Sequence, residues 1–128
     1  MTSTASFPVA GDAGVHAFQR FDVYRVALEF HGLVPSLVPR RGFASLRDQI
    51  DRASASILLN IAEGSGRFSR SDKAQFYLIA RGSAMESAAV LDILLSRDVI
   101  TAGVYHHGHG LLIRVTQMLT RLVQRMQA

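Results

Sequence analysis

The sequence of 128 residues contains no cysteine, and only 19% of its residues are charged. Without cysteine, the chain has no disulfides, no thiolate metal ligands and no cysteine nucleophile. Ordinary domains carry about 25% charged residues, and a small domain has a large surface to cover with them. The shortage of charge therefore indicates that a partner covers part of this surface.

Long hydrophobic runs are absent as well. The longest stretch without charge, residues 99–113, contains three glycines and three histidines, whereas a membrane-spanning helix needs roughly 20 mostly apolar residues. Residues 1–17 contain no lysine or arginine and no long apolar stretch, unlike a secretory signal. We therefore expect a cytoplasmic protein that does not enter a membrane.

Helical periodicity dominates the sequence from residue 18 onward, without the strict alternation of apolar and polar residues that marks a strand. The length suits one domain, which we place at residues 18–128. Residues 1–17 are rich in Thr, Ser, Ala and Gly, which predicts a disordered tail. Four helices are expected, near residues 18–38, 43–63, 69–96 and 101–126.

Local signals mark several helix ends. Ser69 and Thr101 are expected to be the N-caps of the third and fourth helices. Pro35 should weaken the end of the first helix. The three glycines between residues 103 and 110 make the first half of the fourth helix a poor helix former.

Four helices with short connections favour an antiparallel up-down-up-down four-helix bundle. A single bundle needs about three apolar positions in seven on each helix, and the last three helices exceed that share on a second face. Such excess apolar surface predicts a homo-oligomer. The expected interface residues are Ala55, Leu58, Leu59, Ala62, Tyr77, Ala84, Ala88 and Leu95.

Polar residues interrupt the apolar faces of the second and third helices, namely Gln49, Asn60, Glu63, Ser83 and Glu86. Two carboxylates in such a set could act as a general acid and a general base. Buried polar groups also have to be hydrogen-bonded, and such contacts can fix how two helices align. We favour the structural interpretation and expect no enzymatic activity.

Three histidines lie close together in the sequence, His106, His107 and His109. Imidazoles are ligands for zinc and nickel. Their spacing matches no helical ligand pair, and no nearby carboxylate completes a site. We expect a polar segment without a metal or cofactor, and keep a metal site as the alternative.

Basic residues exceed acidic ones by a formal charge of +4, and 13 of the 14 are arginines. Arginine suits bidentate contact with phosphate, so a basic surface for RNA or DNA is one interpretation, with salt-sensitive and weakly sequence-specific binding. The other is a solvated face whose arginine stems cover apolar neighbours. The candidate residues are Arg40, Arg41, Arg67, Arg70, Lys73, Arg114, Arg121 and Arg125.

Two runs of sequence carry a family resemblance. Residues 48–64 (DQIDRASASILLNIAEG) and 76–86 (FYLIARGSAME) resemble the hallmark segments of the four-helix-bundle proteins named for the 23S rRNA intervening sequence. The combination of Asn-Ile-Ala-Glu-Gly with a later Gly-Ser and a Glu three residues past that Ser is fairly specific. The likeness spans residues 18–124.

The resemblance implies an all-helical bundle assembled as a fivefold homomeric ring. It implies no defined activity. A related branch serves diversity-generating retroelements as the accessory partner of a reverse transcriptase, where a basic ring surface is thought to engage nucleic acid. We therefore expect a self-associating, non-enzymatic scaffold that binds RNA, DNA or a nucleic-acid-processing protein. The alternative is a protein-interaction scaffold with no nucleic-acid role.

Overall fold

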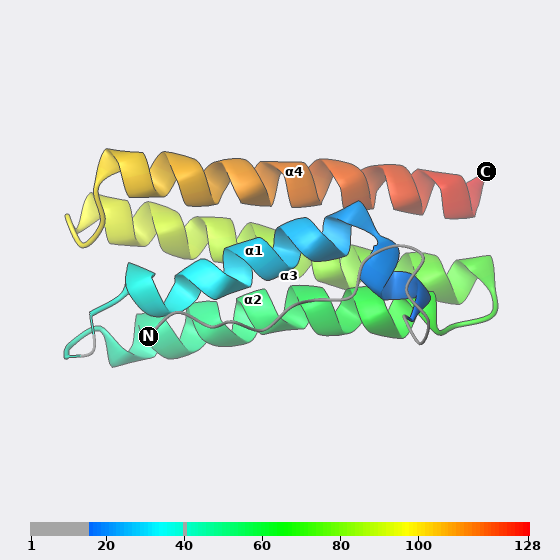
Figure 1. The fold of residues 1–128 in the computed structure, drawn as a ribbon, viewed down its shortest axis with the longest axis horizontal. Helices are drawn as coiled ribbons and strands as arrows, with labels where there is room; N and C mark the ends of the chain where they lie inside the picture. Colours follow the sequence, from blue (N-terminus) through cyan, green and yellow to red (C-terminus); the bar gives the residue numbers. More distant parts are fainter. Residues whose placement is uncertain (1–15, 40) are drawn as a thin grey trace.

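The computed structural model describes residues 16–39 and 41–128, and within these ranges every regular element is a helix. Four long helices lie side by side along the length of the molecule (Figure 1). The prediction of an all-α fold with four helices is thereby confirmed. The elements are a short 3₁₀ helix η1 (Ala17–Arg20), α1 (Asp22–Leu37), α2 (Ala44–Ser65), α3 (Arg70–Ser96) and α4 (Ala102–Gln127).

The two predicted N-caps are both formed. The Ser69 hydroxyl accepts a hydrogen bond from the backbone N–H of Asp72 at 3.0 Å, and the Thr101 hydroxyl accepts one from Val104 at 3.2 Å. The first half of α4 is helical despite its glycines. Gly108 is buried there, and a Cβ atom on it would lie 3.3 Å from Leu91 Cδ1. Close packing of α4 against α3 therefore explains why residue 108 is a glycine.

The first helix begins later than predicted. Ala17 opens the 3₁₀ turn instead of belonging to a tail, and the extended backbone of Phe21 (φ −69°, ψ 131°) separates that turn from α1. The remainder of the expected tail, residues 1–15, lies outside the described residues. At its other end α1 continues two residues beyond Pro35, whose fixed φ is compatible with a last helical turn.

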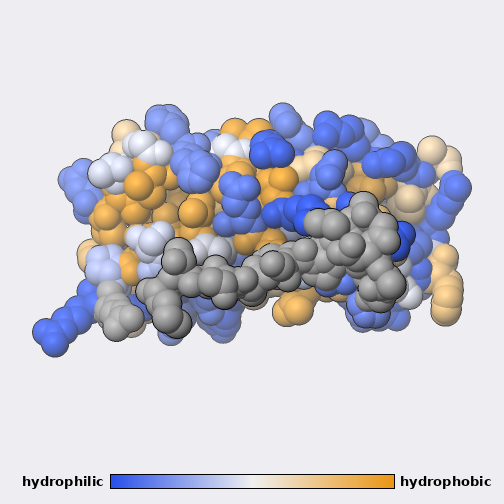
Figure 2. Space-filling view, in the orientation of Figure 1, coloured by the Kyte–Doolittle hydropathy of each residue, from blue (hydrophilic) through white to orange (hydrophobic). Residues whose placement is uncertain are grey.

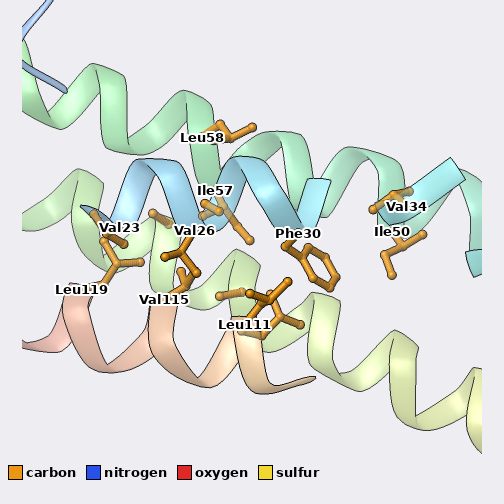
Figure 3. Packing of buried hydrophobic residues seen from close by; sticks show 14 of the residues in the cluster. Val23, Val26, Phe30, Val34, Ile50, Ile57, Leu58, Leu111, Val115 and Leu119 are labelled. Carbon is orange, nitrogen blue, oxygen red and sulfur yellow. The ribbon is translucent and has the colours of Figure 1, made fainter. Parts of the chain in front are cut away.

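Buried aliphatic and aromatic side chains from all four helices form one core (Figure 3). Phe30, Ile57 and Val115 are fully buried at its centre. Two hydroxyls, Ser54 and Ser87, are also fully buried. Both bond a carbonyl of the preceding turn, Asp51 at 3.1 Å and Ser83 at 3.0 Å, so their burial leaves no polar group unsatisfied. Among the described residues, no helix is long and apolar enough to span a membrane.

The interface prediction was wrong for three residues. Tyr77 (2% exposed), Ala84 (0%) and Leu58 (9%) are buried within a single subunit. The side of α3 that carries Tyr77 and Ala84 therefore faces the core, whereas other apolar residues of α3 lie at the surface. The other expected interface residues stay at the surface: Leu59 is exposed, and Ala55, Ala62, Ala88 and Leu95 are partly exposed.

Gly64 marks the closest approach of α2 to α3. A Cβ atom at this position would lie 2.8 Å from Tyr77 Cε1 and 3.1 Å from Phe76 Cβ. We expect Gly64→Ala to lower the free energy of unfolding by about 1–3 kcal/mol because of overpacking, as measured by urea denaturation. Gly32→Ala in α1 is the control, since its Cβ meets nothing within 4 Å and should raise stability by about 0.5–1 kcal/mol. Equal effects of the two changes would contradict the close approach.

Candidate functional site

Three arginines of α4 project from the molecule. Arg114, Arg121 and Arg125 are exposed, and none has a hydrogen bond or ion pair with another described residue. No carboxylate follows Asp98 in the sequence, so α4 is purely basic. These guanidinium groups are free to contact an anionic ligand.

The basic residues around the α2–α3 turn are instead engaged within the subunit. Arg67 pairs with Glu63 at 2.7 Å, and its guanidinium lies 4.7 Å from the centre of the Phe76 ring. The Lys73 ammonium donates to the carbonyls of Ser65 at 2.9 Å and Gly64 at 3.4 Å. Lys73 thus stabilises the C-terminal end of α2, where a cation is favourable. Two of its three N–H donors are therefore engaged within the subunit.

The basic residues of the α2–α3 turn and two of the three α4 arginines, Arg121 and Arg125, lie at one end of the molecule. Arg114 lies seven residues before Arg121, farther along α4. Arg70 Nη1 donates to the backbone oxygen of Ala128 at 3.2 Å, which joins the start of α3 to the end of α4. A hollow of about 280 Å³ is lined by the start of α1 and by Arg121 and Arg125. Figure 1 shows these starts and ends on the right of the molecule. We call this region the basic end.

The basic end holds the surplus positive charge of the chain. Its basic residues outnumber its three acidic residues (Asp22, Glu63 and Asp72) by four, which equals the formal net charge of +4. Arg41 lies in the turn before α2, at the opposite end, and Arg40 lies outside the described residues. The basic residues here are Arg20, Arg25, Arg67, Arg70, Lys73, Arg121 and Arg125.

The polar residues of α2 and α3 form a hydrogen-bonded connection between these helices. The hydroxyls of Ser56 and Ser83 lie 2.8 Å apart. Asn60 Nδ2 donates to the backbone and side-chain oxygens of Ser56, at 2.8 and 3.0 Å. Gln49 Nε2 reaches Glu86 Oε2 at 3.4 Å. Ser56, which the sequence analysis did not include in this set, bonds both Ser83 and Asn60 and is its centre.

The two carboxylates of this set do not meet. Glu86 lies beside Gln49, whereas Glu63 pairs with Arg67 at the other end of α2. Gln49 and Glu63 are fourteen positions apart along α2, which corresponds to about 21 Å. An acid–base pair made of Glu63 and Glu86 therefore has no geometric basis.

The histidines near the start of α4 are arranged around Tyr105. His109 stacks on the Tyr105 ring at 5.1 Å, and His106 approaches it edge-on at 5.4 Å. Tyr105 donates to Asp92 Oδ1 at 2.7 Å, and this hydrogen bond raises the pKa of Tyr105. Burial likewise raises the pKa of Tyr77. Within residues 16–39 and 41–128, no three potential metal ligands come together.

An apolar stripe on the outer face of α3 was missed by the sequence reasoning. Leu78 (47% exposed), Met85 (50%) and Ile93 (38%) project from this face. Gly82 lies between the first two, and the space beyond its Cβ position is open to 4 Å. We call this surface the α3 stripe. Sequence periodicity could not find it, because apolar residues occur on every side of α3 and do not reveal which side is buried.

Lys73 provides a test of the division between structural and free cations. Lys73→Met removes its bonds to the α2 carbonyls and should lower the free energy of unfolding by about 1 kcal/mol. Denaturant unfolding measures this loss. A polyanion column should retain the variant nearly as strongly as the parent protein. Unchanged stability with lost retention would show that Lys73 contacts ligands.

Comparison with known proteins supports the expected family. A family profile described as 23S rRNA-intervening sequence protein matches residues 19–121. The structure is similar to the crystal structure of a protein with unknown function from the S23 ribosomal protein family of Bacteroides thetaiotaomicron. The two are 27% identical with a TM-score of 0.73, over 79% of this chain and 97% of that chain. No curated protein matches the sequence.

The matched residues include both sequence runs that carried the resemblance, residues 48–64 and 76–86. In the structure these runs are the facing parts of α2 and α3, joined through Ser56 and Ser83. The family motif therefore lies at a helix–helix contact. The chain belongs to the 23S rRNA-intervening sequence protein family.

Proposed function

We propose that this protein is a non-enzymatic, self-associating scaffold that binds nucleic acid through its basic end. In this proposal the subunit is an antiparallel up-down-up-down bundle, and copies pack through the α3 stripe into a closed ring. The family resemblance implies five copies. The observation that carries the proposal is that one subunit has two separate surfaces: an apolar stripe on α3, and arginines on α4 that have no partner among the described residues.

The α3 stripe supports self-association. Its large apolar side chains are about half exposed, in a chain with few charges to cover its surface. Beside it, Met85 and Ile113 border an apolar hollow of about 170 Å³ between α3 and α4. Figure 2 shows further apolar surface over the half of the molecule where α1 ends. Extended apolar surface of this kind is typical of protein–protein contacts.

Gly82 adds a steric argument. Glycine within a helix costs about 0.5–1 kcal/mol relative to alanine, and no atom of the described residues lies within 4 Å of the position that a Cβ on Gly82 would take. The absence of a side chain would let a helix of another copy approach closely. Gly32 also faces open space, but Gly82 lies between the exposed Leu78 and Met85 of the α3 stripe, which is why we place it in the contact.

Gly82→Arg is therefore expected to dissociate the assembly without unfolding the subunit, because the new side chain has room in the subunit and none in the contact. Sedimentation velocity should show a shift to the mass of one subunit, with unchanged helical circular dichroism. Gly32→Arg, also directed into open space, should assemble normally. A Gly82→Arg variant of unchanged mass would exclude the α3 stripe as the contact.

The basic end supports nucleic-acid binding. Arg121 and Arg125 have no partner among the described residues, and arginine pairs with phosphate through two parallel hydrogen bonds. A closed ring would repeat this end once per copy. Repetition raises the effective concentration for a long polyanion and strengthens a modest individual contact.

Reversal of charge at the basic end tests the proposed nucleic-acid binding. Arg121→Glu with Arg125→Glu should abolish retention of RNA and DNA at low salt, because phosphate contacts dominate such affinity. Arg52→Glu with Arg97→Glu changes the net charge equally, away from the basic end, and should reduce affinity much less. Electrophoretic mobility shift over a salt series measures both.

Equal losses in the two double variants would mean that net charge, not the basic end, attracts the nucleic acid. If the parent protein assembles but binds neither RNA nor DNA at low salt, the proposed scaffold role is retained and the proposed nucleic-acid binding is rejected. The protein-interaction scaffold is then the remaining function.

A further inference from the structure

A hollow at the basic end combines an apolar floor with a charged rim. It measures about 280 Å³ and lies where α1 begins and α4 ends. Phe21, Met118 and Leu122 line it and pack against the core, with Val23 buried behind them. The remaining lining residues are the charged Asp22, Arg121 and Arg125.

The two arginines indicate an anionic ligand. The apolar floor indicates that this ligand also carries an apolar group. Free phosphate or polyphosphate would contact the guanidinium groups and leave the apolar floor exposed to water. A ligand with a planar apolar body beside its phosphate would cover both. The hollow approaches the lower range of small-ligand pockets, which is about 300 Å³, and therefore suits one small unit.

Asp22 further restricts the kind of ligand that fits the hollow. Its carboxylate forms no ion pair with Arg121 or Arg125 within the part of the chain that the structure describes. A carboxylate repels a bare anion but accepts hydrogen bonds from amino or hydroxyl groups. Nucleobases and ribose carry such donors, and a base can stack on an aromatic side chain such as Phe21.

We infer that this hollow binds one nucleotide of a single-stranded nucleic acid, with the base against Phe21 and the adjacent phosphate at Arg121 and Arg125. The inference rests on the proposed nucleic-acid function and specifies its site. A duplex keeps its bases stacked and paired, so it can use the arginines but not the floor. Single strands should therefore bind more tightly than duplexes of the same sequence.

The absence of tryptophan from the sequence allows a direct test. Phe21→Trp introduces a single indole into the hollow, and a mixed-sequence single-stranded RNA should quench its fluorescence by stacking. Phe68→Trp is the matched control, since Phe68 is fully exposed in the turn between α2 and α3, at the same basic end. Its fluorescence should change little. Equal quenching of both, or none at position 21 while the RNA is bound, would overturn the site.

Phe21→Leu provides a second test that does not enlarge the side chain. It retains apolar volume but removes the flat ring, so affinity for the single-stranded RNA should fall by about fivefold or more. Affinity for inorganic polyphosphate and for the RNA duplex should not change. A parallel loss for all three probes would show general damage and contradict the stacking role, as would unchanged RNA affinity.

These outcomes separate the inference from the proposed function. If Arg121→Glu with Arg125→Glu abolishes RNA binding while Phe21→Leu and Phe21→Trp give the negative results above, the basic end binds nucleic acid and the hollow does not. If the parent protein binds no nucleic acid at all, both proposals fail together.

Discussion

The rotation of α3 about its own axis is the constraint on which the molecule depends. α3 packs against both α2 and α4, and it turns Tyr77, Ala84 and Leu91 inward because these residues fill the space between its neighbours. Gly64 allows the α2 and α3 backbones to lie close together beside Tyr77. Once that side is buried, Leu78 and Met85 have no place except the surface.

Several features of the fold could be predicted because their causes are local. Ser69 and Thr101 cap the backbone groups of their own helices, so a short stretch of sequence is enough to identify them. The rotation of α3 is different, because it depends on the combined burial available from two other helices. The sequence of a helix with apolar residues on every side does not show which side is buried. Tyr77 and Ala84 were therefore predicted at the subunit surface, whereas they lie in the core.

The same distinction applies to the candidate site. Composition predicts a basic surface, but it does not show which cations bond other groups of the subunit. Lys73 bonds carbonyls at the end of the preceding helix, and Arg70 reaches the end of α4. The single lysine occupies a position where a compact ammonium can bond two neighbouring carbonyls. The basic residues of α4 all carry the planar guanidinium that suits phosphate. Only the spatial arrangement separates these two uses.

The uneven placement of charge gives the subunit a permanent electrostatic direction. Because the surplus cations gather where α4 ends, the positive potential is strongest beyond that end and weak beside the opposite one. A long-range field of this kind exerts a torque as well as an attraction. A polyanion approaching through solution would turn the molecule before touching it, so that collisions begin in an already favourable orientation.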